Sequence, residues 1–125
     1  MLAALNLTAI GLGLAAGGLA ATLVGLVAGG LLTVIGVPDG ADIGLLAGVI
    51  SGLLVSGLVA GRLSVHSHRF HGSVVGLVFA GLLIALASFG AAQVSVVTVI
   101  WLATLSAAVG GLGGWWSGRN RAPAP

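Results

Sequence analysis

Residues 7–37 read LTAIGLGLAAGGLAATLVGLVAGGLLTVIGV, a stretch without a charged side chain. A helix that crosses a bilayer needs about 20 mainly apolar residues, because the hydrocarbon core is about 30 Å thick and each residue rises about 1.5 Å. The stretch therefore predicts a transmembrane helix at about residues 7–36. Because the stretch is longer than one span requires, the helix either tilts strongly or starts as an interfacial segment before Thr8.

Polar interruptions divide the rest of the chain into three further apolar runs. The first interruption holds both aspartates, Asp39 and Asp42, beside a proline and a glycine that favour a turn. The second, residues 62–71, carries arginine and histidine, and the third is weak. We predict an all-α integral membrane protein with one domain, 1–116, and a short basic, proline-containing tail, 117–125. The four predicted transmembrane helices occupy about residues 7–36, 43–61, 73–90 and 94–116.

The composition supports a membrane protein. Hydrophobic residues make up 58% of the chain and charged residues 5%, whereas soluble domains carry roughly 25% charged residues. Such a chain cannot build a water-facing surface. The lack of cysteine excludes disulfides and thiolate metal sites. Four basic residues against two acidic ones are too few for the dense basic patch of a nucleic-acid-binding protein.

The placement of arginine predicts the orientation, since cytoplasmic loops near membrane helices carry the excess of Lys and Arg. All four arginines fall between the second and third predicted helices or near the C-terminus. Both termini are therefore expected in the cytoplasm, with the protein in the cell (plasma or inner) membrane. Two adjacent tryptophans precede the tail, at the headgroup level that indole rings prefer. The residues predicted at the membrane interface are Arg62, Arg69, Trp115, Trp116, Arg119 and Arg121.

Small residues recur at four-residue steps along each predicted helix. In lipid, such ridges let two helix backbones approach closely, as in GxxxG pairs. The sequence therefore predicts packing by small-residue ridges, with the first helix on the second as the main pair. The ridges can be satisfied within one chain or by a second copy. The predicted packing residues are Gly13, Gly17, Gly25 and Gly29, then Gly44, Gly48 and Gly52, then Gly72 and Gly76, then Gly110 and Gly114.

Three histidines, His66, His68 and His71, are candidate metal ligands, because three neutral imidazoles suit zinc or copper. Their spacing lacks the helical i, i+4 step, and that side of the membrane offers no acid or cysteine to complete a coordination shell. The favoured interpretation is a solvated basic loop that attracts anionic lipid headgroups. We therefore predict no bound metal and no cofactor.

The predicted spans contain no ionisable side chain, which argues against a proton-coupled exporter. The aspartates and the histidines are expected on opposite sides of the membrane, so no Ser-His-Asp arrangement can form within one chain. The sequence therefore predicts a protein that is not an enzyme.

The run GLVAGR at 57–62, followed by HGSVVGL at 71–77, resembles small bacterial four-helix membrane proteins of the YrzE-like kind. In that group, a helix of small residues ends in an Ala-Gly-Arg-like exit, and a short basic loop leads into a glycine-rich third helix. The resemblance covers the middle of the chain. It implies the four-helix membrane architecture and no activity.

These features favour a structural or accessory membrane subunit that packs its helices against one another and against a membrane-protein partner or further copies of itself. The alternative is an oligomeric channel, pore or holin-like permeabiliser, because glycine-lined helices can surround a path and a dewetting gate needs no charge. A third hypothesis is a transporter for an apolar or neutral solute, with helix breaks near Gly29-Gly30 or Gly110-Gly111 as its site.

Overall fold

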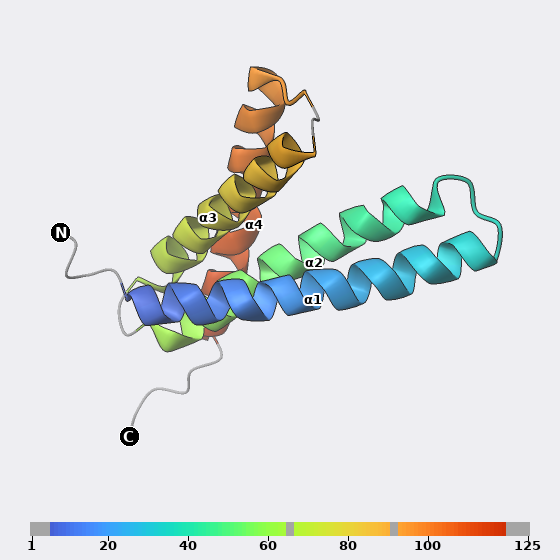
Figure 1. Ribbon diagram of the computed structural model, residues 1–125. Coiled ribbons are helices and arrows are strands. Elements are labelled where there is room, and N and C mark those ends of the chain that lie inside the picture. The colour runs from blue at the N-terminus through green and yellow to red at the C-terminus, as the bar shows by residue number, and fades with distance from the viewer. Residues whose placement is uncertain (1–5, 65–66, 91–92, 120–125) are drawn as a thin grey trace.

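The computed structural model describes residues 6–64, 67–90 and 93–119, and every regular element in these ranges is an α-helix. Each of the four helices is long and apolar enough to cross a membrane. The predicted all-α fold with four such helices is therefore confirmed. The helices are α1 (Leu7–Val34), α2 (Gly40–Leu63), α3 (His68–Phe89) and α4 (Val96–Arg119) (Figure 1).

The helix boundaries differ from those expected, by three or more residues at the start of α2, the start of α3 and the end of α4. α2 begins at Gly40 instead of residue 43, and α3 begins at His68 instead of residue 73. α4 runs from Val96 to Arg119, so Ser117–Arg119 belong to this helix and not to the predicted tail; the remaining tail residues lie outside the described ranges. The predicted boundaries were set where charged and polar side chains begin. The observed helices extend further, because backbone hydrogen bonding continues past the apolar segment.

The turn between α1 and α2 is a Schellman motif. Gly36 takes a positive φ of 79°, which glycine adopts without a Cβ penalty. The N–H of Val37 donates to the Leu32 carbonyl at 2.9 Å, and the N–H of Gly36 donates to the Thr33 carbonyl at 3.1 Å. Pro38 follows and cannot continue the helix. This local chemistry ends α1 and reverses the chain into α2.

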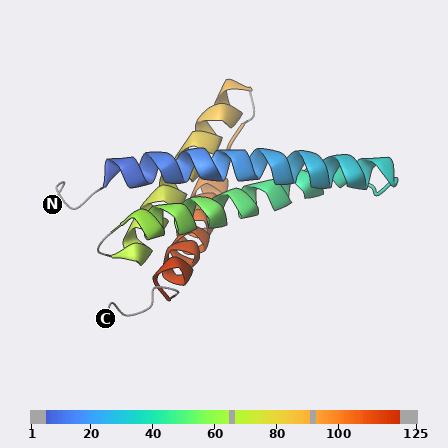
Figure 2. The same cartoon turned by 90° about the horizontal axis from the view of Figure 1, so that it is seen from below.

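The four helices form two hairpins, α1–α2 and α3–α4, that cross each other. α2 is the central helix, because it packs against each of the other three. α1 and α3 begin, and α2 and α4 end, at one end of the molecule, which we call the convergent end (Figures 1 and 2). From there the hairpins diverge, so the α1–α2 turn lies far from the end of α3 and the start of α4.

The interior consists mainly of small side chains, with Ile10, Leu53 and Phe79 as the buried large ones, and most large apolar side chains lie on the exterior. Val75 is the largest fully buried side chain, and it packs with Ile10 and Ala60 where α1, α2 and α3 meet. Large apolar side chains such as Leu19 and Leu23 of α1 are more than half exposed. Such a surface is the reverse of that of a water-soluble helical domain, whose apolar stripe faces the core.

Candidate functional site: the helix-packing faces and the basic end

The face between α1 and α2 is built of backbone-to-backbone contacts at glycines. A Cβ atom added to Gly17 would lie 2.6 Å from the Gly52 carbonyl oxygen, and one added to Gly48 would lie 2.5 Å from the Ala21 carbonyl oxygen. A Cβ on Gly44 would overlap the backbone of Gly29. Real Cβ atoms essentially never lie within 3.0 Å of such a neighbour, so these positions have no room for a side chain.

A second close contact joins α2, α3 and α4 at Gly110. A Cβ on Gly57 of α2, or on Gly72 of α3, would overlap the carbonyl oxygen of Gly110. A Cβ on Gly110 would in turn overlap the carbonyl oxygen of Gly72 and lie 3.1 Å from the Cα of Gly76. Gly110 is therefore a point at which both α2 and α3 come close to the backbone of α4.

The predicted packing glycines divide into two groups by the space around them. At most of them an added Cβ would come within 3.0 Å of another helix. At Gly25 and Gly29 the nearest atoms would lie 3.6 Å and 3.5 Å away, which is ordinary van der Waals contact. The crowded positions are Gly13, Gly17, Gly44, Gly48, Gly52, Gly72, Gly76, Gly110 and Gly114.

Gly113 is crowded by the backbone of α2 but was not among the predicted packing residues of α4. A Cβ on Gly113 would lie 2.6 Å from the Leu54 carbonyl oxygen of α2. Gly113 and the buried Ser117 form a four-residue step of their own, and Ser117 faces Gly61 of α2. This second step, beside Gly110 to Gly114, is the sequence signal that α4 contacts two helices instead of one.

The hydroxyls of the small residues donate within their own helices. Ser56 donates to the Leu53 carbonyl at 2.9 Å, and Ser117 donates to the Gly114 carbonyl at 2.7 Å. Thr22 and Thr33 on α1 bond the carbonyls four residues back in the same way. No buried side-chain nitrogen or oxygen of the described residues lacks a hydrogen-bond partner.

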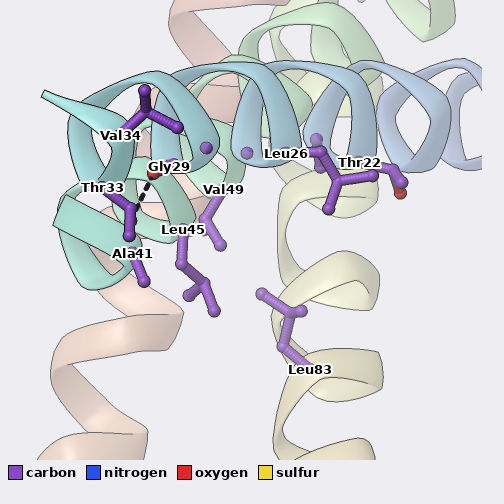
Figure 3. A pocket seen from close by; sticks show the side chains of 12 residues that line it. Thr22, Leu26, Gly29, Thr33, Val34, Ala41, Leu45, Val49 and Leu83 are labelled. Atoms are coloured by element: carbon purple, nitrogen blue, oxygen red, sulfur yellow. Dashed lines mark hydrogen bonds between the residues drawn. The ribbon is translucent and has the colours of Figure 1, made fainter.

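An open apolar groove of about 730 Å³ lies between the diverging hairpins, lined by α1, α2 and Leu83 of α3 (Figure 3). Its lining includes glycines 25, 29 and 30 of α1, and a Cβ on Gly30 would meet nothing within 4 Å. The hydroxyls of Thr22 and Thr33 in the lining are already bonded to backbone. The groove therefore offers apolar surface and the exposed backbone of Gly30, while Gly29 is buried against α2. The lining side chains labelled in Figure 3 include Leu26, Val34, Leu45, Val49 and Leu83.

The two described histidines hold the convergent end together. The N–H of Asn6 donates to His71 Nε2 at 3.4 Å, while His71 Nδ1 lies 3.3 Å from the Ser67 carbonyl oxygen. Because a carbonyl only accepts, Nδ1 carries the hydrogen and both ring nitrogens are engaged. His68 Nδ1 lies 2.7 Å from the Gly61 carbonyl oxygen and donates to it.

The expectation of a solvated histidine loop is therefore wrong for His68 and His71. Both lie in the first turn of α3, and the side chain of His71 is 3% exposed. Their nitrogens point to different partners, and the described residues contain no group of three His, Cys, Asp or Glu side chains that could hold a metal. His66 lies outside the described residues.

Asn6 joins the start of α1 to two other helices. Its Oδ1 accepts the N–H of Ala9 at 3.2 Å and caps α1, while its Nδ2 donates to the Leu63 carbonyl of α2 at 3.5 Å. We expect Asn6→Ala to lower the free energy of unfolding by about 1 kcal/mol, the usual loss when a helix N-cap is removed. Unfolding in mixed micelles measures this change. Asn6→Asp keeps the cap and should retain most of the stability; equal losses for both variants would contradict a capping role.

Basic and aromatic side chains gather at the same end. Arg69 of α3 and Arg119 of α4 place their guanidinium carbons 5.5 Å and 5.1 Å from the ring centroid of Trp115. Arg62 lies in the last turn of α2, and the more exposed Trp116 follows Trp115. Arg121, also predicted at the membrane interface, lies outside the described residues.

The acidic side chains lie at the other end of α2. Asp39 precedes its first turn and Asp42 lies within that turn. About 30 Å of helix, at about 1.5 Å per residue, separates them from the histidines beyond its last turn. The described residues therefore do not bring a carboxylate and an imidazole together.

No protein-family model, curated protein sequence or solved structure matches this chain. The likeness to YrzE-like proteins therefore stays a prediction, and the function of this protein must be inferred from its own residues.

Proposed function

We propose that this protein is a non-enzymatic structural or accessory subunit of the cell membrane that binds a transmembrane helix of a partner protein. All four helices cross the bilayer, with both termini in the cytoplasm. The arrangement of side-chain size supports membrane insertion, because large apolar side chains face outward on every helix while small ones lie between helices. The position of Arg62, Arg69 and Arg119 at the convergent end supports the orientation.

Packing by glycine ridges, a glycine zipper, holds the helices together in this proposal. Lipid tails are as apolar as leucine, so helices in a bilayer gain little from burying large apolar side chains. They gain instead from dispersion contacts and weak Cα–H···O bonds between closely spaced backbones. The contacts at Gly17, Gly48 and Gly110 have the short spacing that such packing needs.

The groove is the observation that carries the accessory role. It presents the exposed backbone of Gly30, beside Gly25, which is partly covered by α2, and glycine offers a lipid chain little surface but lets another helix approach closely. Its hydroxyls are already bonded, so a polar solute would find few partners there. The matching occupant is an apolar transmembrane helix with small residues of its own.

Gly30→Leu tests this proposal, with Gly11→Leu as the matched control. Both glycines lie on α1 with nothing within 4 Å of an added Cβ, but only Gly30 lines the groove. We expect Gly30→Leu to reduce the recovery of a partner about tenfold, which corresponds to about 1.4 kcal/mol. Gentle extraction from native membranes followed by native mass spectrometry provides the measurement. A partner retained equally by both variants would rule out the groove.

The same experiment distinguishes an accessory subunit from the alternative function, an oligomeric channel or pore. If only copies of this chain co-purify, an oligomeric channel or pore becomes the better explanation. The open glycines Gly11 and Gly18 on α1 and Gly81 on α3 leave room for contacts between copies. Ion or dye leakage from liposomes that hold the purified protein would then support a pore, and tight liposomes at every protein density would exclude it.

A further inference from the structure

Two arginines from different helices converge on one tryptophan at the convergent end. Arg69 comes from the first turn of α3 and Arg119 from the last residue of α4. Their guanidinium carbons lie 5.5 Å and 5.1 Å from the Trp115 ring centroid, within the range of about 6 Å for cation–π attraction. The indole ring therefore lies within cation–π range of two like charges from different helices.

No acidic side chain of the protein balances this pair. The sequence has two acidic residues in all, and both lie at the opposite end of α2. Arg119, at the end of α4, is placed favourably for the helix dipole, but Arg69 stands at the start of α3, where the dipole disfavours a cation. The cap residue Ser67 makes no side-chain hydrogen bond to that helix start. An anion bound by both arginines would offset the repulsion between them. It would also interact favourably with the dipole at the start of α3.

The chemistry of the pair suits a phosphate group. A guanidinium presents a planar fork of N–H donors that matches phosphate oxygens in pairs, and it is more weakly hydrated than an ammonium group. The Trp115 ring orients both forks and is itself 38% exposed, while Trp116 is 65% exposed. Exposed indoles at the end of an apolar helix lie at the level of lipid headgroups.

We propose that Arg69, Trp115 and Arg119 form a binding site for the phosphodiester of an anionic phospholipid, such as phosphatidylglycerol. The bound headgroup links the start of α3 to the end of α4. The site rests on the membrane insertion proposed above and does not depend on a partner protein.

Native mass spectrometry of the purified protein, titrated with phosphatidylglycerol or phosphatidylcholine in mild detergent, tests this site. We expect preferential binding of phosphatidylglycerol. Its affinity should fall about 10-fold or more for Arg69→Gln and for Arg119→Gln, since each variant loses charge-assisted hydrogen bonds to the phosphate. Arg62→Gln is the matched control, because it removes one charge from the same end of the molecule, in the last turn of α2. We expect it to change the affinity less than about threefold, as general attraction would.

Three outcomes would overturn the proposal. Equal losses for Arg62→Gln and the other two variants would indicate diffuse attraction without a site. Equal binding of phosphatidylcholine would exclude recognition of the net negative charge. Displacement of the lipid by millimolar inorganic phosphate would identify a site for free phosphate.

The lysine variants cover the case in which a glutamine variant fails to fold. Arg69→Lys and Arg119→Lys keep the charge but lose the planar fork, so we expect them to fold and to bind phosphatidylglycerol more weakly than the wild-type protein. Wild-type affinity in both would contradict the site. If the arginine variants lose the lipid but still co-purify with a partner protein, the lipid site and the accessory role are independent of each other.

Discussion

Gly110→Leu is expected to destabilise the protein by about 3 kcal/mol, at the upper end of the usual range for overpacking a close contact. α2 and α3 both approach the backbone of Gly110, and a Cβ added there would meet the backbone of α3 at Gly72 and Gly76. Because these nearest atoms are backbone atoms, α3 cannot yield by rotating a side chain and must move as a whole. The unfolding midpoint in mixed micelles of mild and denaturing detergent measures the loss.

The control for this variant is Gly81→Leu in α3. An added Cβ at Gly81 would meet nothing within 4 Å, and leucine has a higher helix propensity than glycine. We expect Gly81→Leu to leave the midpoint unchanged or to raise it. If Gly110→Leu were tolerated as well as Gly81→Leu, the close contact of α4 with α2 and α3 would be wrong.

The second large loss of stability is expected for a substitution at Gly17, which contacts α2, and not for one at its neighbour Gly18, which contacts no other helix. Gly17→Leu should cost about 1–3 kcal/mol, because its Cβ would lie 2.6 Å from the Gly52 carbonyl oxygen and 2.6 Å from the Ser56 Cβ. Gly18→Leu should be neutral, since its Cβ would meet nothing within 4 Å. The same micelle unfolding experiment compares the two.

Amide hydrogen exchange adds a local measurement to this pair. Faster exchange along α1 and α2 in Gly17→Leu, with α3 and α4 unchanged, would place the damage at the α1–α2 face. Because the two positions are adjacent, membrane depth and general hydrophobicity are nearly the same for both variants. Equal destabilisation by Gly17→Leu and Gly18→Leu would therefore contradict a one-sided contact.

The sequence was sufficient to predict four helices because two of the three polar interruptions are strong and the apolar run after them is long enough for two spans. The turn with Pro38 and the two aspartates separates α1 from α2, and the apolar runs have the length of a bilayer span. The start of α3 was misplaced for a physical reason. His68 and His71 look like loop residues by polarity, yet their ring nitrogens bond to Gly61 and Asn6, so they stay at the convergent end while the backbone is already helical.

The groove and the Arg69–Trp115–Arg119 site could not be predicted in the same way. Both depend on how one hairpin crosses the other, which brings Leu83 of α3 opposite α1 and places Arg69 beside the end of α4. A four-residue step identifies a small-residue ridge, but it does not say which helix lies on that ridge. Gly113 illustrates this limit, because only the position of α2 distinguishes it from the open glycines of α1.

The inverted distribution of side-chain size determines how this sequence can diverge during evolution. An outward leucine such as Leu19 or Leu23 can be exchanged for valine, isoleucine or phenylalanine without affecting a contact between helices. An interior glycine such as Gly48 has no acceptable replacement, since even alanine adds the Cβ that the neighbouring backbone excludes. In descendants of this chain, the large residues should therefore vary freely among themselves, while the spacing of the crowded glycines is retained.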